Sequence, residues 1–216
     1  MITVQTIIIL VVLFLYVPIG RFYRIGKDAR TLIKTKYDRG STNLAGFAYL
    51  SSLFVIGLGV VLTYRNVASF ESGFASWIGV AITLMGFLIR LLAFFVLGRF
   101  YTRTIRITHS HRLVMTGPYK YMRHPGYLGV LLIFMGAGLA ISNWISLVYV
   151  CLVMPSSLLY RIQAEEMMMT DHFGEDYRIY MRKTWPLIPY LCKRDRREIP
   201  EQLRDEKAGI ALRKIR

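Results

Sequence analysis

The residues best suited to chemistry lie in one short stretch, GPYKYMRHPGYLG, at positions 117–129. It combines two cationic side chains, a histidine and three tyrosines with five glycine and proline residues. Its Gly-Pro and Pro-Gly pairs are turn signals, so His124 is expected just outside a helix that begins near Leu128. Free N–H groups of residues 126–128 would then attract a carboxylate or phosphate, with Arg123 adding positive charge. An ordinary basic loop with interfacial tyrosines would have the same composition.

Two adjacent carboxylates, Glu165 and Glu166, are the next candidates. The sequence has no other acid between Glu71 and Asp171. Carboxylates at this place could bind hydroxyl groups or offset the positive charge of an amino group or a sulfonium. The alternative is the solvated face of an amphipathic helix. Arg161 precedes Glu165 by four residues, so a pair on one helix face is expected.

Five apolar segments must position these groups. The chain has 216 residues, of which 54% are hydrophobic, and its mean hydropathy is +0.40. A helix of roughly 20 apolar residues crosses a bilayer, so we predict an all-α integral membrane protein with about five transmembrane helices. The first segment lacks the basic start and the small-residue cleavage site of a signal peptide, and is predicted to be retained. The segments are 2–20, 44–64, 74–98, 128–141 and 144–160.

The net charge of +15 is concentrated in three hydrophilic regions, 21–40, 99–127 and 161–216, which hold 26 of the 28 Lys and Arg residues. Cytoplasmic loops of membrane proteins collect Lys and Arg. With the N-terminus outside, five spans place all three regions, the C-terminus and the candidate site in the cytoplasm. The charge is therefore better explained by membrane orientation and anionic lipids than by binding of nucleic acid.

Two residues within the apolar segments stand out. Arg90 lies about 12 Å below the cytoplasmic end of its helix, where it either snorkels to the surface or faces a polar cavity. Pro155 is expected to bend the fifth helix. The two cysteines, Cys151 and Cys192, have no spacing typical of zinc ligands, and no metal is predicted.

A short amphipathic helix is predicted after the fifth span. Gly174 should end that span, and a helix near 175–184 would place Tyr177 and Tyr180 on one face. We expect this segment to lie beside a pocket that opens to the cytoplasm. The predicted divisions of the chain are a transmembrane scaffold at 1–110, a catalytic region at 111–192 and a charged cytoplasmic tail at 193–216.

These motifs resemble a known family. Residues 116–129, TGPYKYMRHPGYLG, resemble the GPY-x-x-x-RHP-x-Y-x-G motif of the isoprenylcysteine carboxyl methyltransferase family. The resemblance runs from Leu113 to Pro189, about half the chain, while the first 110 residues match only as membrane helices. The later residues that match the family pattern are, in order, Arg161-Ile162, Glu165-Glu166, His172-Phe173-Gly174, Tyr177 and Tyr180.

The resemblance implies S-adenosylmethionine as cofactor, bound between the fourth and fifth helices and the C-terminal segment. The residues expected to line its site are Tyr119, His124, Pro125, Tyr127, Leu128, Gly129 and Glu165. The catalytic candidates are Arg161, Glu166 and Arg90, and the substrate-side candidates are Arg123, Tyr177 and Tyr180.

The implied function is transfer of a methyl group to a lipophilic acceptor, such as the carboxylate of an isoprenylcysteine-like C-terminus. Its partners would be membrane lipids and a lipophilic small molecule or prenylated substrate. Membrane sterol and steroid reductases, which bind NADPH, carry a similar Arg-His-x-x-Tyr segment but lack the GPY…RHPGYLG motif with a downstream Glu-Glu pair. A membrane scaffold or transporter would be expected to carry polar residues at mid-membrane depth in several helices.

Overall fold

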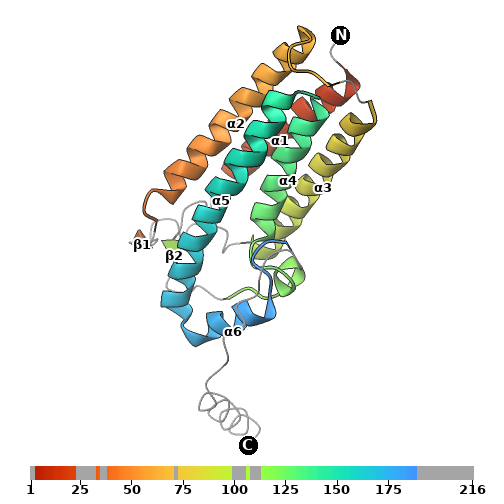
Figure 1. Ribbon diagram of the computed structural model, residues 1–216. Coiled ribbons are helices and arrows are strands. Elements are labelled where there is room, and N and C mark those ends of the chain that lie inside the picture. The colour runs from red at the N-terminus through yellow and green to blue at the C-terminus, as the bar shows by residue number, and fades with distance from the viewer. Residues whose placement is uncertain are drawn as a thin grey trace, which may run out of the picture.

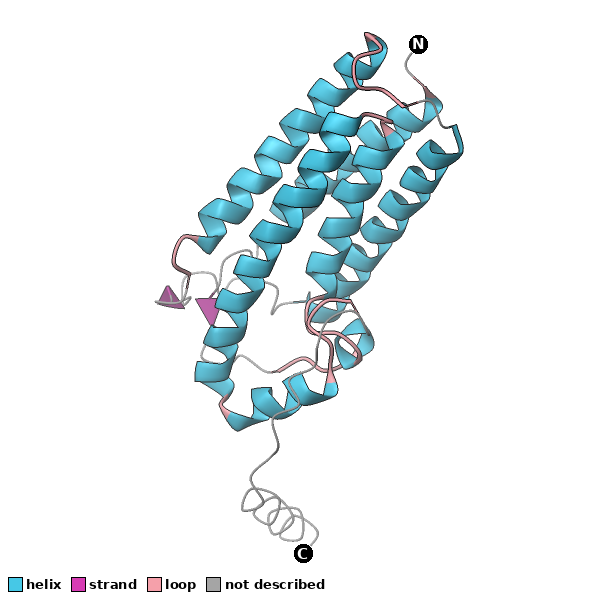
Figure 2. Ribbon diagram, in the orientation of Figure 1, coloured by secondary structure: helices cyan, strands magenta, loops and turns pink. Residues whose placement is uncertain are grey.

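The computed structural model describes residues 3–22, 33–34, 38–70, 73–98, 106–107 and 113–188, with backbone alone for 17–22, 33–34 and 106–107. The described chain is α-helical apart from a 3₁₀ turn, η3, and a two-residue antiparallel ladder of β1 with β2, as Figure 2 shows. The predicted all-α class is confirmed. The elements are α1 (Val4–Phe22), β1 (Ile33–Lys34), α2 (Ser41–Tyr64), α3 (Gly73–Leu97), β2 (Arg106–Ile107), η3 (Gly117–Lys120), α4 (Pro125–Ala140), α5 (Trp144–Phe173) and α6 (Glu175–Lys183).

Helices α1 to α5 lie side by side as a bundle, and α6 lies across one end of it (Figure 1). All five predicted apolar segments are helical. By length and composition, α2, α3 and α5 could each cross a membrane, whereas α1 and α4 offer shorter apolar stretches. Large apolar side chains such as Phe14, Phe54 and Phe74 are exposed on the outer faces, as lipid contact requires. The fold is that of an integral membrane protein.

Helix α5 is longer than a bilayer is thick. Its 30 residues rise about 45 Å, against a hydrocarbon core of about 30 Å. Its last turns therefore extend beyond the apolar layer and carry the glutamate pair, as predicted. The helix continues through Pro155, and the bend expected there stays a prediction. Gly174, at a φ of 54°, ends it as expected.

The closest helix packing is between α3 and α4, where glycines let the backbones touch. A Cβ atom on Gly79 would overlap the backbone nitrogen of Ala140. One on Gly136 would lie 2.6 Å from the backbone nitrogen of Thr83. Small residues permit such approach between membrane helices. These contacts hold the C-terminal half of α4 in a fixed place relative to α3.

We expect Gly79→Ala to destabilise the protein by about 1–3 kcal/mol, because the two backbones must separate to admit the methyl group. Gly57→Ala in α2 is the matched control, since a Cβ there would meet nothing within 4 Å. That change should be neutral or stabilise by about 0.5–1 kcal/mol. Thermal unfolding in detergent measures both, and equal midpoints would show that the α3–α4 contact is looser than described.

The end of the bundle away from α6 is joined by a polar turn. The N–H of Trp144 donates to the Ala68 carbonyl at 2.9 Å, and the buried Asn143 side chain donates to the Val67 carbonyl at 2.9 Å. Asn143 also caps α5 by accepting from the N–H of Ser146. The loop after α2 and the turn between α4 and α5 therefore share one end of the bundle, as the predicted alternation of spans requires.

The start of α4 differs from the prediction. The helix begins at Pro125, three residues before Leu128, because a proline has no N–H to lose at the first helical position. His124 does lie just outside the helix. The N–H groups of Tyr127 and Leu128 both donate to the His124 carbonyl at 3.1 Å. The prediction that these two amides are free for a ligand is therefore wrong.

The predicted chain divisions stay predictions, and the tail 193–216, Cys192 and Pro189 lie outside the described residues.

Candidate functional site

The segment before α4 is held by the segment that follows α6. The N–H of Trp185 donates to the Tyr121 carbonyl at 3.0 Å, and the N–H of Arg123 donates to the Trp185 carbonyl at 2.8 Å. The N–H of His124 donates to the Pro186 carbonyl at 3.2 Å. These bonds form a short parallel ladder. It orients the side chains of Arg123 and His124 toward α5.

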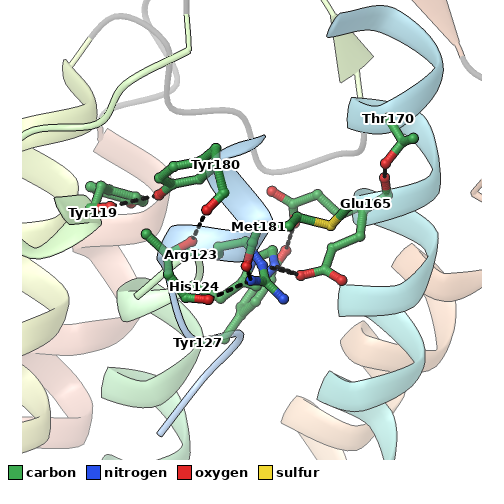
Figure 3. Close-up of polar contacts among 10 residues, drawn as sticks. Tyr119, Arg123, His124, Tyr127, Glu165, Thr170, Tyr180 and Met181 are labelled. Carbon is green, nitrogen blue, oxygen red and sulfur yellow. Dashed lines mark hydrogen bonds and ion pairs between the residues drawn. The ribbon is translucent and has the colours of Figure 1, made fainter. Parts of the chain in front are cut away.

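Arg123 joins α4, α5 and α6. Its side chain is buried, and its Nε donates to Oε1 of Glu166 at 2.6 Å. Its Nη1 donates to the carbonyls of Met181 and Thr184, both at 2.8 Å, at the end of α6 (Figure 3). A cation at a helix C-terminus satisfies carbonyls that lack helical partners. These observed contacts are with protein groups, and the substrate contact expected of Arg123 stays a prediction.

His124 approaches the same carboxylate. Its Nε2 lies 3.2 Å from Oε1 of Glu166, and its ring stacks on Tyr127 with centroids 5.5 Å apart. Only 6% of His124 is exposed. Glu166 therefore meets both basic side chains of the Arg-His-Pro motif.

Tyr127 stands between Arg161 and Glu165. Its hydroxyl donates to Oε2 of Glu165 at 2.6 Å and accepts from Nε of Arg161 at 2.8 Å. Arg161 is 6% exposed, so its charge is largely withdrawn from water. The predicted pairing of Arg161 with Glu165 is thus mediated by a hydroxyl from another helix. The glutamate pair of α5 and the first turns of α4 form one polar cluster, as expected.

The tyrosines of η3 and α6 lie beside this cluster. The Tyr180 hydroxyl donates to the Tyr119 carbonyl at 2.7 Å. Tyr177 and Tyr180 are buried on one face of α6, as predicted. Burial raises the pKa of both phenols, and the nearby charge of Glu166 adds to the rise. Both hydroxyls are therefore protonated at neutral pH and can donate hydrogen bonds.

Arg90 of α3 packs against the first turns of α4. A Cβ atom on Gly126 would lie 2.7 Å from Nη1 of Arg90, and one on Gly129 would lie 2.8 Å from its backbone nitrogen. This places Arg90 at the site end of the bundle. Pro125 and Leu128 are buried, and Leu128 belongs to the apolar core.

Three polar atoms at this cluster have no hydrogen-bond partner within the described part of the chain. They are Nδ1 of His124, Oε1 of Glu165 and the hydroxyl of Tyr177. Each could bind a ligand without breaking a contact that the fold already uses. Within the same described residues, no group of three His, Cys, Asp or Glu side chains could hold a metal ion.

Sequence reasoning missed two residues at the start of α2. Nη1 of Arg161 donates to Oγ1 of Thr42 at 3.1 Å, and Thr42 donates in turn to Asp38. Asp38 before Ser41 and Thr42 is a typical helix-start pattern. That pattern predicts where α2 begins, and it gives no sign of a partner 119 positions along the chain.

The sequence model of the isoprenylcysteine carboxyl methyltransferase family matches residues 77–171. This range covers most of α3, the Arg-His-Pro motif, α4 and the glutamate pair. Over this range the chain is similar to the isoprenylcysteine carboxyl methyltransferase family. The match begins earlier than the resemblance predicted, because α3 is part of it. It ends before Tyr177 and Tyr180, so it gives these two residues no support.

Curated relatives match slightly more than half of the chain. A probable protein-S-isoprenylcysteine O-methyltransferase of Oryza sativa subsp. indica is 35% identical over 123 residues, which are 56% of this chain and 64% of the relative. Protein-S-isoprenylcysteine O-methyltransferase A of Arabidopsis thaliana is 31% identical over 115 residues, 52% of this chain and 58% of the relative. The match thus spans less than two thirds of the length of these relatives.

A solved structure shares the fold. It is the eukaryotic intramembrane Ras methyltransferase of the isoprenylcysteine carboxyl methyltransferase type. The two align with a TM-score of 0.61 and 23% identity, over 82% of this chain and 61% of the solved one. At this identity the likeness establishes the membrane helical architecture.

Proposed function

We propose that this protein is a membrane methyltransferase that uses S-adenosylmethionine and esterifies the carboxylate of a lipophilic acceptor of the S-prenylcysteine type. The observation that carries the proposal is the meeting of the Arg-His-Pro motif with the glutamate pair. Glu166 contacts Arg123 and His124, and Tyr127 contacts Glu165, within the family-matched region. The names of the curated relatives supply the acceptor class.

The side chains at the cluster fit such a cofactor. Oε1 of Glu165 can face a positively charged ammonium or sulfonium, and Nδ1 of His124 and the Tyr177 hydroxyl can bond polar groups. The stacked rings of His124 and Tyr127 offer a flat surface for a purine. The residues proposed to line the cofactor are Tyr119, His124, Pro125, Tyr127, Leu128, Gly129 and Glu165.

The chain contributes orientation and exclusion of water. When bound, S-adenosylmethionine would supply a methyl group on a positively charged sulfur. The acceptor oxygen would bond to the methyl carbon in line with the carbon–sulfur bond, which breaks. A carboxylate acceptor is ionised at pH 7 and needs no base, so alignment by the protein supplies the catalysis, worth about 7–11 kcal/mol when geometry is good. Arg161 and Arg90 are the proposed orienting cations, and Glu166 and Tyr180 fix the surrounding elements.

The proposal also includes the route by which the acceptor arrives and the side of the membrane on which the cluster lies. A lipophilic acceptor reaches the cluster sideways from the bilayer, between helices. We place the N-terminus outside and the cluster at the cytoplasmic surface, which is supported by the concentration of Lys and Arg in the regions on that side.

Ligand-dependent stability tests the proposal. S-adenosylmethionine and S-adenosylhomocysteine should each raise the unfolding free energy of the detergent-purified protein by about 2.7 kcal/mol at 100 times the dissociation constant. NADPH at the same concentration is the control and should have no effect. A response to NADPH alone would favour the reductase alternative, and no response to any of the three would favour a scaffold.

A further inference from the structure

The start of α2 carries a polar group that lies outside the family-matched region. Oδ1 of Asp38 accepts from the Ser41 hydroxyl at 2.6 Å and from the Thr42 N–H and hydroxyl, both at 3.0 Å. Side chains that bond the first N–H groups stabilise a helix start. This much is an ordinary helix cap.

Thr42 has a second partner that a cap does not need. Its hydroxyl accepts from Nη1 of Arg161 at 3.1 Å, and Nε of the same guanidinium donates to the Tyr127 hydroxyl. An arginine offers donors and no acceptor, so each hydroxyl must turn its own proton away from it. The Thr42 hydroxyl donates its hydrogen bond to Asp38, and the Tyr127 hydroxyl donates its hydrogen bond to Glu165.

These contacts form one continuous chain across three elements of the fold. Asp38 and Glu165 end it, and the buried guanidinium of Arg161 lies at its centre. Partial burial raises the pKa of Asp38, but hydrogen bonds from Ser41 and Thr42 and the positive charge of Arg161 outweigh it and lower that pKa. Asp38 is therefore ionised at neutral pH, and a buried cation is stable only when its donors are satisfied in this way.

We propose that Thr42, supported by Asp38, is a positioning residue for methyl transfer. It holds the Arg161 guanidinium in the plane from which Nε reaches the Tyr127 hydroxyl. The Tyr127 hydroxyl therefore keeps donating its hydrogen bond to Glu165. This inference rests on the proposed function. Without the Thr42 hydroxyl, Nη1 loses this acceptor, and the guanidinium is held less firmly in the plane that faces Tyr127.

Three variants of the full chain in lipid vesicles test this. Thr42→Val keeps the shape and removes the hydroxyl, Thr42→Ser restores the hydroxyl, and Ser41→Ala removes a different bond to the same Asp38 oxygen. The readout is kcat and KM for S-adenosylmethionine, with an N-acetylated S-prenylcysteine as acceptor, beside the thermal midpoint. We expect Thr42→Val to lower kcat about tenfold or more, since small misplacements are costly. Thr42→Ser should stay within about threefold of wild type, and Ser41→Ala should keep the wild-type kcat despite a lowered midpoint.

Wild-type kcat in Thr42→Val would overturn the inference, and so would an equal loss of kcat in Ser41→Ala, which would mean that only the helix start matters. Should Thr42→Val not fold, Asp38→Ala takes its place: it removes the acceptor that directs the Thr42 hydroxyl, and an unchanged kcat there would also overturn the inference. A wild-type protein that transfers no methyl group and does not respond to S-adenosylmethionine would instead overturn the proposed function itself.

Discussion

Replacing Arg123 with alanine should lower the free energy of unfolding by about 3–5 kcal/mol and abolish methyl transfer, because it removes one partner of a buried ion pair. Glu166 would lose its 2.6 Å bond, and the carbonyls of Met181 and Thr184 would lose their donor. Helix α6 would then no longer be held against the start of α4. Chemical unfolding in detergent, with the methyl-transfer assay on the same samples, measures both effects.

Two further variants sharpen this prediction. Arg123→Lys keeps the charge, but a single ammonium cannot match the fork of an arginine, so the loss should be intermediate. Arg178→Ala removes an exposed cation of α6 that pairs with Glu175 at 3.6 Å. An exposed pair of this kind contributes about 0–1 kcal/mol. If Arg123→Ala and Arg178→Ala lower the free energy of unfolding by the same amount, Arg123 does not hold the site together.

Tyr127→Phe should reduce the rate of methyl transfer by about a hundredfold while the protein stays folded. The change removes one oxygen atom and leaves Nε of Arg161 and Oε2 of Glu165 without their common partner. Each buried group left unsatisfied costs about 1–3 kcal/mol, and both groups would move to recover bonds. A misplacement of about 1 Å can cost a hundredfold in rate. Steady-state kinetics measure the loss of rate, and calorimetric binding of S-adenosylhomocysteine shows whether the folded protein still binds its ligand.

Tyr121→Phe is the matched control for this variant. Tyr121 lies six residues earlier in the same motif and is 62% exposed. Its hydroxyl has no hydrogen-bond partner within the described residues, so the variant should bind and turn over as wild type does. Equal activity of Tyr127→Phe and Tyr121→Phe would remove Tyr127 from the site.

The helices could be predicted because each apolar run is uncharged or nearly so and is bounded by charged or turn-forming residues. The prediction erred at the start of α4, where Pro125 was assigned to the turn and instead forms the first helical position. Gly174 as a helix breaker indicates that α5 continues past the apolar run 144–160, and this brings Glu165 and Glu166 to the level of the Arg-His-Pro motif.

The contacts within the cluster could not be predicted from local patterns. Arg161 and Glu165 are correctly spaced for a direct pair, yet Tyr127 of another helix stands between them. The donors of Arg123 satisfy the last carbonyls of α6, whose position depends on the turn at Gly174, and no local pattern indicates these bonds. Thr42 lies in a part of the chain that composition assigns to scaffold. Such contacts depend on how whole helices pack, which periodicity does not report.

A structure determined with S-adenosylhomocysteine bound tests the central claim most directly. The account predicts that the ligand lies at the α6 end of the bundle, in contact with His124, Tyr127 and Glu165. A ligand bound at the Asn143 end, or more than one side-chain length from both α4 and the glutamate pair, would contradict it.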